Sequence, residues 1–477
     1  MKKIFQILYI LLFFILLCLP MLLMPFLRND ASLEKRNLTE LPAYVEDGRL
    51  NLGFSDQFET WLNDRLPLRA QLLTAANALK GELLHGQTAN VIVGKEGWLF
   101  YNVESEDYMD TNALSEGQIR AAAITLSLLE EAVTARGGRF TFVPAPNKSS
   151  VYGEYMPSCY RAAPENNLTR LTAALREEGV TFTDLRQVLR DAKGEPVYHR
   201  RDSHWNYRGA LIGWNAILDS LGRAHETHLD APFTVEKTWR GDLDKLLYPA
   251  GGVMDEQVIY DVPTAPFRFT YPMGVSDAAA QLEIFMSDRE ERDGTISTQN
   301  LKRKDGSSLY MVRDSFGRAL LPWMIDSYEK AAFRRVDRPD LVSVRDGTDV
   351  VYEIAERNLS RVIASAPFLY APRREGVTAE GCADGGQVEL HLEKQGYLRL
   401  CGALPELPGD GRVYLQLEQN GTTLTFEAFP IYEAELLGGN GTNGFSAFFS
   451  KDLGLSGEYR VTVITCNTVF QCGLIAV

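Results

Sequence analysis

The sequence predicts an α/β protein in which a mainly parallel sheet is flanked by helices, with a C-terminal antiparallel β-sandwich and an N-terminal transmembrane helix. Three observations predict this order. An apolar run opens the chain, strand-like and helix-like segments alternate between about 115 and 370, and apolar and polar residues alternate in the last hundred residues. Strands alternating with helices favour a parallel sheet covered on both faces, whereas a period of two is typical of half-buried antiparallel strands.

Length and composition agree with this architecture and exclude several classes of function. The 477 residues correspond to about three domains at roughly 150 residues each. Hydrophobic residues make up 45% and charged residues 23%, which excludes disordered and collagen-like chains. With 49 basic and 63 acidic residues the net charge is −14, so the chain lacks the basic face that binding to nucleic acid requires.

Residues 1–28 are predicted to be an uncleaved membrane anchor. The run Ile4–Leu27 is broken only by Gln6 and two prolines, and as a helix it would span about 36 Å, enough for a bilayer. Lys2 and Lys3 are expected to hold the N-terminus in the cytoplasm, so the rest of the chain is expected outside the cell. A cleaved signal peptide is the alternative, but no small-residue cleavage site accompanies the run.

The next two segments are a lead-in and the α/β domain. Residues 29–84 are expected to form a juxtamembrane lead-in, since bulky apolar residues recur at helical spacing between Phe54 and Leu66. Residues 85–371 are expected to form the α/β domain. Its predicted strands are 91–94, 98–101, 140–143, 180–182, 309–312 and 349–353, and its predicted helices are 116–135, about 167–178 and about 316–328, with a further helix after 353.

Residues 375–477 change character and are predicted to form the β-sandwich. They hold 16 of the 39 glycines, and 388–393, 412–418 and 459–465 alternate apolar and polar residues. Residues 372–374 are the expected linker. A glycan-binding or partner-binding role is one hypothesis for this region; the aromatic residues that could serve it (Tyr397, Tyr414, Phe445) are, as the alternative, core residues of a sandwich.

Cysteine and histidine spacing gives no metal site. Four cysteines, Cys382, Cys401, Cys466 and Cys472, fall in the tail, where two disulfides are plausible outside the cytoplasm. The sequence contains no CxxC and no HExxH, so neither a metal nor a cofactor is predicted.

One candidate for chemistry is Ser315, at the turn between an apolar strand and a helix. A serine in that position is presented at the edge of an α/β sheet, where backbone N–H groups can face an oxyanion. Gly317 fits the second glycine of the hydrolase elbow G-x-S-x-G, whereas Arg313 replaces the first. Aspartate–serine pairs such as Asp314-Ser315 also simply cap helices, and that alternative stays open here.

The second candidate is the segment 200–206, which contains Asp202 and His204. A serine hydroxyl is a poor nucleophile until a base takes its proton, and a carboxylate can hold a histidine in the tautomer that does so. The two residues are close enough in sequence to meet in a bent loop. A structural histidine beside a surface aspartate is the alternative, and Trp205 would provide apolar cover in either case.

Together with their flanks, the two segments resemble the SGNH-hydrolase-like alginate O-acetyltransferase family, especially its Gram-positive DHHW branch. Asp202, His204 and Trp205 match the D-x-H-W motif, with Ser203 where that branch usually has histidine. Ser315 matches the nucleophile of the D-S-[FY] block. The resemblance covers roughly 50–370 and includes the segments 63–69, 93–100, 146–152, 241–243 and 349–359.

The resemblance implies acetyl transfer to an extracellular polysaccharide, with acetyl supplied by a membrane-bound O-acyltransferase partner. Ser315 would be the nucleophile, His204 the general base and acid, and Asp202 its orienter, and the backbone N–H of Ser315 would help to hold the oxyanion. Asn147 and Lys148 follow the 140–143 strand and are candidates for a second oxyanion donor, although both could be turn residues. Arg313 and Trp205 complete the predicted substrate-facing set.

Three other functions remain open from the sequence. Water as the second acceptor would give an SGNH-type carbohydrate esterase with the same triad. A non-catalytic polysaccharide-binding scaffold would keep the fold without the triad geometry. The anchor and the β-rich tail also fit a sensor or an adhesin.

Overall fold

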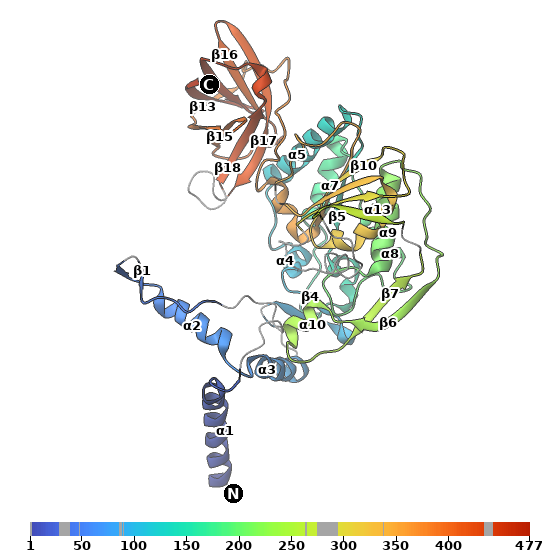
Figure 1. The fold of residues 1–477 in the computed structure, drawn as a ribbon. Helices are drawn as coiled ribbons and strands as arrows, with labels where there is room; N and C mark the ends of the chain where they lie inside the picture. The colour runs from blue at the N-terminus through green and yellow to red at the C-terminus, as the bar shows by residue number, and fades with distance from the viewer. Residues whose placement is uncertain are drawn as a thin grey trace.

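The computed structural model describes residues 2–27, 39–46, 48–84, 88, 90–262, 265–273, 294–336, 338–433 and 442–477. Figure 1 shows an N-terminal helical arm, a central α/β region and a C-terminal β-region in chain order. Residues 28–38, where the predicted anchor ends and the predicted lead-in begins, lie outside the described residues.

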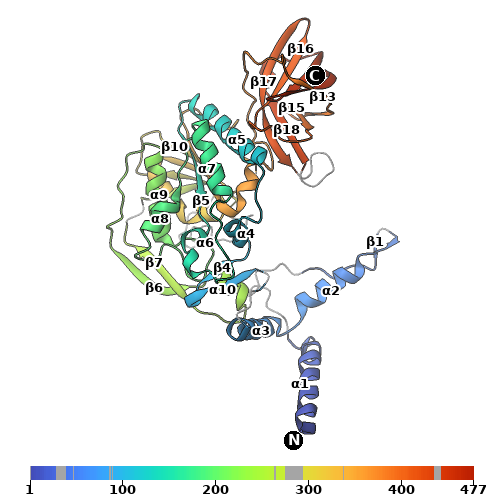
Figure 2. The ribbon, with the colours of Figure 1, turned by 180° about the vertical axis from the view of Figure 1, so that it is seen from behind.

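The N-terminal arm contains one helix that is long and apolar enough to cross a membrane. Helix α1 (Lys2–Leu23) includes the 20-residue span Ile4–Leu23, which is almost entirely exposed. It projects away from the rest of the chain (Figures 1 and 2). The elements that follow it are β1 (Val45–Glu46), β2 (Arg49–Leu50), α2 (Phe54–Arg65) and α3 (Arg69–Leu84).

A six-stranded sheet forms the centre of the α/β region. Its order is β5-β12-β10-β11-β9-β8; the first four strands are parallel and the last two antiparallel. The strands are β5 (Phe140–Ala145), β12 (Asp349–Ala355), β10 (Ser308–Val312), β11 (Lys330–Arg334), β9 (Thr295–Asn300) and β8 (Phe267–Tyr271). The predicted parallel sheet is therefore confirmed, extended by an antiparallel edge.

Alternate residues of the central strands bury opposite faces of this sheet. In β10, Leu309 and Met311 join one hydrophobic cluster, and Tyr310 and Val312 join the other. The first cluster is covered by α8 (Leu185–Asp191), α9 (Tyr207–Ser220) and α13 (Leu321–Ser327). The second is covered by α5 (Glu116–Thr134) and α7 (Asn167–Glu178). Both faces of the central strands are buried, which is why the sequences of these strands are continuous apolar runs.

Smaller elements complete the α/β region. They are β3 (Val91–Val93), β4 (Leu99–Tyr101), α4 (Glu104–Met109), α6 (Lys148–Val151), β6 (Phe233–Trp239), α10 (Asp242–Leu247) and β7 (Asp255–Tyr260), with short 3-10 helices η2 (Lys95–Gly97) and η3 (Gly153–Tyr155). β3 pairs with β4, and β6 with β7, as antiparallel hairpins. Helix α3 docks on this part, since Asn77 Nδ2 donates to the carbonyl of Leu247 at 2.8 Å.

Some predicted elements differ in kind from those observed. The segment 180–182 makes a single parallel bridge, Phe142 to Phe182, and is not a strand of the sheet. The predicted helix at 316–328 consists of a 3-10 helix η4 (Phe316–Leu320) followed by α13, and the helix expected after 353 is the 3-10 helix η5 (Glu356–Ile363). Tight 3-10 turns follow the strands here because the chain bends sharply at the sheet edge.

The C-terminal region is the predicted antiparallel β-structure. Its eight strands have the order β13-β20-β19-β16-β17-β18-β15-β14, antiparallel except for β13 with β20. Strand β17 pairs with β16 along its first half and with β18 along its second, so it joins two half-sheets around one core. The strands are β13 (Ala383–Gln387), β14 (Leu390–Lys394), β15 (Leu398–Ala403), β16 (Val413–Gln419), β17 (Thr422–Glu433), β18 (Thr442–Phe449), β19 (Glu458–Ile464) and β20 (Thr468–Ala476), with η6 (Lys451–Leu453).

The structure corrects one expectation for this region and decides between two alternatives for Phe445. All six cysteines are free thiols, and Cys401 is buried within the sheet, so the plausible disulfides are not formed. Phe445 is fully buried in the core, and Tyr397 packs edge-on against Phe448 and at a tilt against Phe368. The core alternative therefore holds for Phe445, which cannot offer its ring to a glycan.

Candidate active site

Three strand ends meet where Ser315 lies. β5, β10 and β12 are parallel neighbours, so their carboxyl ends open at the same edge of the sheet. Ser315 follows β10 by three residues, Asn147 follows β5 and Glu356 follows β12. This edge is where ligands bind in open α/β sheets.

Asp314 fixes the turn that carries Ser315. One carboxylate oxygen of Asp314 accepts from the backbone N–H of Phe316 at 2.9 Å, and the other accepts from the N–H of Ala355 at 2.8 Å. Burial raises the pKa of Asp314, but the charge of Arg357 and these backbone donors outweigh it and lower the pKa below its ordinary value. Asp314 is thus an ionised cap that ties the turn to the end of β12.

Ser315 itself does not cap the helix that follows. Its side chain makes no capping hydrogen bond, and its Oγ lies 2.8 Å from Nε2 of His204. The alternative in which the serine serves only as a helix cap therefore does not describe its side chain.

His204 connects Ser315 to Asp202. Its Nδ1 lies 2.7 Å from Oδ1 of Asp202, which also accepts the backbone N–H of His204 at 3.0 Å. Because Nδ1 faces a carboxylate it carries the proton, which leaves Nε2 free to accept from the serine hydroxyl. Ser315, His204 and Asp202 thus form one continuous chain of hydrogen bonds, the geometry that activates a serine.

Asp202 is buried but fully satisfied. Its Oδ2 accepts from the indole Nε1 of Trp239 at 3.0 Å and from the backbone N–H of Asp242 at 2.9 Å. Burial raises the pKa of Asp202, but the hydrogen bond and charge of His204 outweigh it and hold that pKa well below its ordinary value. The carboxylate therefore stays ionised and can stabilise an imidazolium.

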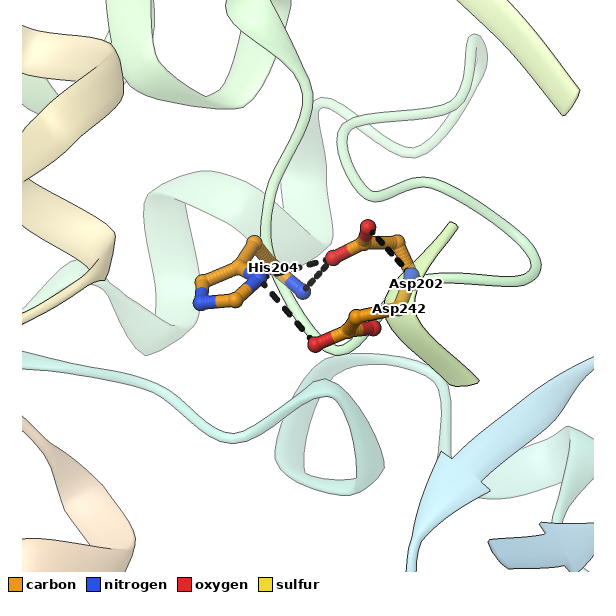
Figure 3. Close-up of side chains that lie close together, drawn as sticks. All are labelled: Asp202, His204 and Asp242. Atoms are coloured by element: carbon orange, nitrogen blue, oxygen red, sulfur yellow. Dashed lines mark hydrogen bonds and ion pairs between the residues drawn. The ribbon is translucent and has the colours of Figure 1, made fainter. Parts of the chain in front are cut away.

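The pKa of His204 moves in the opposite direction. Burial lowers it, but the hydrogen bond that His204 donates to Asp202 and the charges of Asp202 and Asp242 outweigh burial, so the net pKa is raised. The side chain remains 26% exposed, which leaves its Nε2 edge open to a reacting group. Figure 3 shows the imidazole facing both carboxylates.

Trp205 joins the two motif segments. It is buried, and its indole Nε1 donates to the carbonyl of Phe316, the residue after Ser315, at 3.0 Å. The Phe316 ring in turn lies beside the His204 ring, with centroids 4.9 Å apart. Trp205 therefore packs behind the site and fixes the distance between His204 and Ser315, so its predicted substrate-facing role becomes a supporting one.

Asn147 and Lys148 use their donors elsewhere. The backbone N–H of Asn147 donates to Glu356 at 2.8 Å and its side-chain amide to Asp107 at 3.0 Å. The buried ammonium of Lys148 lies within 3.3 Å of the carbonyls of His199 and Arg200 and 2.5 Å from that of Asp202.

These side-chain donors are thus engaged away from Ser315, and the oxyanion role of Asn147 and Lys148 stays a prediction. An ammonium bound to three carbonyls of the 199–202 segment supports the loop that carries Asp202 and His204. Arg313 is likewise buried, and its Nη1 donates to the carbonyl of Asp314, which places it under the turn of Ser315.

Asp202, His204 and Asp242 also offer ligand atoms within 4.8 Å of one another, the spacing of a metal site. Their lone pairs are already engaged, because both oxygens of Asp202 accept two donors each and Nδ1 of His204 carries a proton. The donor set therefore fits a serine–histidine–carboxylate chain better than a cation.

Asp242 and Trp239 are site residues that the sequence did not single out, and Ser203 was noted only as the motif position where the DHHW branch usually has histidine. Trp239 ends β6 and Asp242 begins α10, about 40 positions after Asp202. The 241–243 segment, which matched the family as a string without a role, contains Asp242, and Trp239 lies just before it.

The fold of the α/β region is that of an SGNH-hydrolase-like domain. Residues 91–252 match the family described as "SGNH hydrolase-like domain, acetyltransferase AlgX". The resemblance to the SGNH-hydrolase-like alginate O-acetyltransferase family predicted from the sequence is confirmed by this match.

Named relatives agree with the family match. The chain is 28% identical over 218 residues to the probable alginate O-acetylase AlgJ of Pseudomonas aeruginosa, covering 43% of this chain and 53% of that protein. It is 22% identical over 205 residues to the AlgJ of Pseudomonas putida, covering 42% and 52%. The chain thus spans about half the length of the curated relatives it matches.

Two solved structures are similar in part. A DHHW family protein from Eubacterium siraeum is 17% identical with a TM-score of 0.43, covering 57% of this chain and 93% of that chain. Bacillus cereus PatB1 is 16% identical with a TM-score of 0.43, covering 56% and 96%.

Proposed function

We propose that the chain is an extracytoplasmic O-acetyltransferase that moves acetyl, through an ester on Ser315, to hydroxyls of a cell-surface polysaccharide. The observation that carries this proposal is the unbroken chain from Ser315 Oγ through His204 to Asp202, with contacts of 2.8 and 2.7 Å. The named relatives, as probable alginate O-acetylases, support acetyl as the group and a polysaccharide as the acceptor.

In the first half of the reaction, Ser315 Oγ attacks the carbonyl carbon of an acetyl donor while Nε2 of His204 takes the hydroxyl proton. The tetrahedral intermediate collapses as the donor's leaving group departs and receives that proton. This leaves a neutral acetyl ester on Ser315. Asp202 stabilises the imidazolium that exists between the two proton transfers.

In the second half, a sugar hydroxyl attacks the same carbonyl while Nε2 takes its proton. The new intermediate releases Ser315, which regains a proton from His204, and the acetylated sugar leaves. Water in place of the sugar gives acetate and therefore an esterase with the same residues.

The N-terminal helix supports the location in this proposal. A single-pass anchor with a cytoplasmic N-terminus would place residues 85–371 outside the membrane, next to a membrane-bound O-acyltransferase that exports acetyl. We also propose that residues 375–477 are an accessory domain without catalytic groups of their own.

The test is mass spectrometry of the full chain after brief exposure to p-nitrophenyl acetate, followed by a polysaccharide acceptor. A gain of one acetyl group on the peptide carrying Ser315, lost when acceptor is added and recovered on the sugar, supports the transferase. Acetyl recovered only as acetate makes the protein an esterase. Unaltered labelling and turnover in Ser315→Ala would contradict the nucleophile itself.

A further inference from the structure

A second carboxylate lies beside the histidine of the candidate site. Oδ2 of Asp242 is 3.6 Å from Nδ1 of His204, on the same side of the ring as Asp202 (Figure 3). Asp242 is 27% exposed, close to the value for His204. The mechanism above leaves this carboxylate without a role.

Close backbone contact brings Asp242 to this position. Gly241 lies against the 201–202 peptide so tightly that a Cβ added to it would come within 2.1 Å of the carbonyl oxygen of Arg201. The next residue then donates its backbone N–H to Asp202 at 2.9 Å. A side chain at position 241 would push the two carboxylates apart.

Ser203 links Asp242 to the histidine. Its hydroxyl donates to Oδ2 of Asp242 at 2.6 Å, and its backbone N–H donates to Oδ1 at 2.7 Å. Because the hydroxyl hydrogen of Ser203 is donated to Asp242, Oγ of Ser203 can act as an acceptor for Nδ1–H of His204. The distance between Oγ and Nδ1 is 3.2 Å. The position where the DHHW branch usually carries histidine is thus used here to connect a second carboxylate to the ring.

We propose that Asp242, acting directly and through Ser203, is a second positioning carboxylate that holds the Nδ1 side of His204 and stabilises the imidazolium in both acyl transfers. This inference rests on the proposed function. Asp202 remains the primary partner because its contact is shorter, and Asp242 adds charge and fixes the ring against rotation.

The charged and titratable groups beside the pair include His199, where burial and the charge of His204 lower the pKa while Asp202 and Asp255 raise it. Asp202 and Asp242 favour the charged ring of His204, whereas the guanidinium of Arg357 opposes it. Asp202 and His204 face Asp242 in turn, and the ammonium of Lys148 lies behind the loop. Burial and the charge of Asp202 raise the pKa of Asp242, while His204 and Ser203 counter that shift.

A merely structural role is the competing explanation, because Asp242 is the first residue of the six-residue helix α10. Loss of a structural carboxylate would lower activity and stability but would leave the titration of His204 where it was. Loss of a carboxylate that favours the imidazolium lowers the pKa of His204. The acid limb of kcat/KM, where His204 must lose its proton, then moves to lower pH.

The experiment compares pH profiles of kcat/KM for p-nitrophenyl acetate in the full chain. Asp242→Asn keeps the shape and removes the charge, and we expect its acid limb to move down by about one pH unit. Ser203→Ala should move the limb in the same direction by less. Asp255→Asn is the matched control, because Asp255 also binds this loop, accepting the N–H of Arg201 at 2.8 Å, but is not placed against His204.

A second measurement follows the pH dependence of inactivation by phenylmethylsulfonyl fluoride, which reports activation of Ser315 without turnover. It should show the same displacement in Asp242→Asn. An acid limb that stays in place in Asp242→Asn, or one that moves equally in Asp255→Asn, would overturn the role of Asp242. If Ser315→Ala retained full turnover in the same assay, the proposed function would fail instead.

Discussion

Two clusters of buried charged residues in this molecule have similar compositions. They differ in whether their hydrogen bonds stay within the cluster or continue to a partly exposed group. One surrounds Asp202 at the sheet edge, and the other surrounds Glu427 of β17, where the C-terminal region meets the α/β region. Glu427 is fully buried and accepts from Arg374 at 2.6 Å and from Arg412 at 2.7 Å. These arginines continue to Glu131 of α5 and Glu178 of α7.

In the Glu427 cluster every charge meets an opposite charge, so the network closes on itself. In the Asp202 cluster the chain of hydrogen bonds runs out through His204 to Ser315, a neutral hydroxyl at a partly exposed edge. The Glu427 cluster is a closed network, which can only hold the two regions together. The Asp202 cluster is an open network, because its histidine can accept a proton from a reacting group and release it again. Substitutions in the two clusters should therefore separate activity from stability.

The residues predicted as a linker belong to the closed cluster. Arg374 donates its backbone N–H to the carbonyl of Thr425 in β17, and the N–H of Glu427 returns to the carbonyl of Pro372. Leu407, Phe429 and Phe448 share a hydrophobic cluster with α5. The C-terminal region is thus packed on the α/β region by both apolar contacts and ion pairs.

The largest loss of turnover is expected on substitution of Ser315 or His204, where the Asp202 cluster reaches the sheet edge. Ser315→Ala and His204→Ala should each lower kcat for p-nitrophenyl acetate by roughly 10⁵-fold or more, because members of such a chain act as a unit. The midpoint of urea unfolding should stay close to wild type, since both side chains lie at an edge. Either variant retaining a tenth of wild-type turnover would break the comparison.

Asp202→Asn should cost somewhat less, roughly 10⁴-fold in kcat, because the amide favours the wrong tautomer of His204 while the serine and oxyanion donors remain. The same assay measures it. A loss larger than that of Ser315→Ala would indicate that Asp202 acts mainly through folding, which circular dichroism of the variant would reveal.

Substitution in the Glu427 cluster should lower the stability of the protein and leave its activity unchanged. Glu427→Gln leaves Arg374 and Arg412 without their shared buried carboxylate, and we expect a loss of about 3 kcal/mol in the free energy of unfolding. Turnover per folded molecule should be unchanged. Glu131→Gln is the matched control: its side chain is 47% exposed, so the loss there should stay below about 1 kcal/mol.

The sequence predicted the parts of the fold that periodicity encodes. β5 and β12 are buried on both faces and read as continuous apolar runs, and α5 carries a capping box from Ser115 to Gln118. The antiparallel strands β9 and β8 at one end of the sheet were missed, because their place in the sheet is set by pairing with strands distant in the sequence. The segments that follow β10 and β12 were predicted as helices, but their 3-10 geometry was not predicted.

The residues of the candidate site likewise fall into those that local sequence predicts and those that only tertiary contacts bring together. Asp202, His204 and Ser315 were predicted because short motifs carry them, and His204 lies within hydrogen-bond distance of both other residues. Asp242 and Trp239 were missed, since both reach Asp202 only through tertiary contacts across about 40 residues. The direction of the Lys148 side chain, toward the carbonyls of residues 199–202, could not be predicted, because sequence position places a residue at an edge without saying which way its side chain points.

The smallest effect is expected at Trp205, which lies between the two segments of the candidate site. Its indole hydrogen bond to the carbonyl of Phe316 joins the histidine segment to the serine segment. Trp205→Phe keeps an aromatic ring and removes that bond, so the unfolding free energy should fall by about 1 kcal/mol, the net contribution of one hydrogen bond. Because the distance between His204 and Ser315 then relies on packing alone, kcat should also fall several-fold with KM little changed. Trp214→Phe is the control, as its indole bonds to Ser327 within the core. It should lose similar stability and keep its kcat; an equal loss of kcat in both variants would mean that Trp205 contributes only bulk.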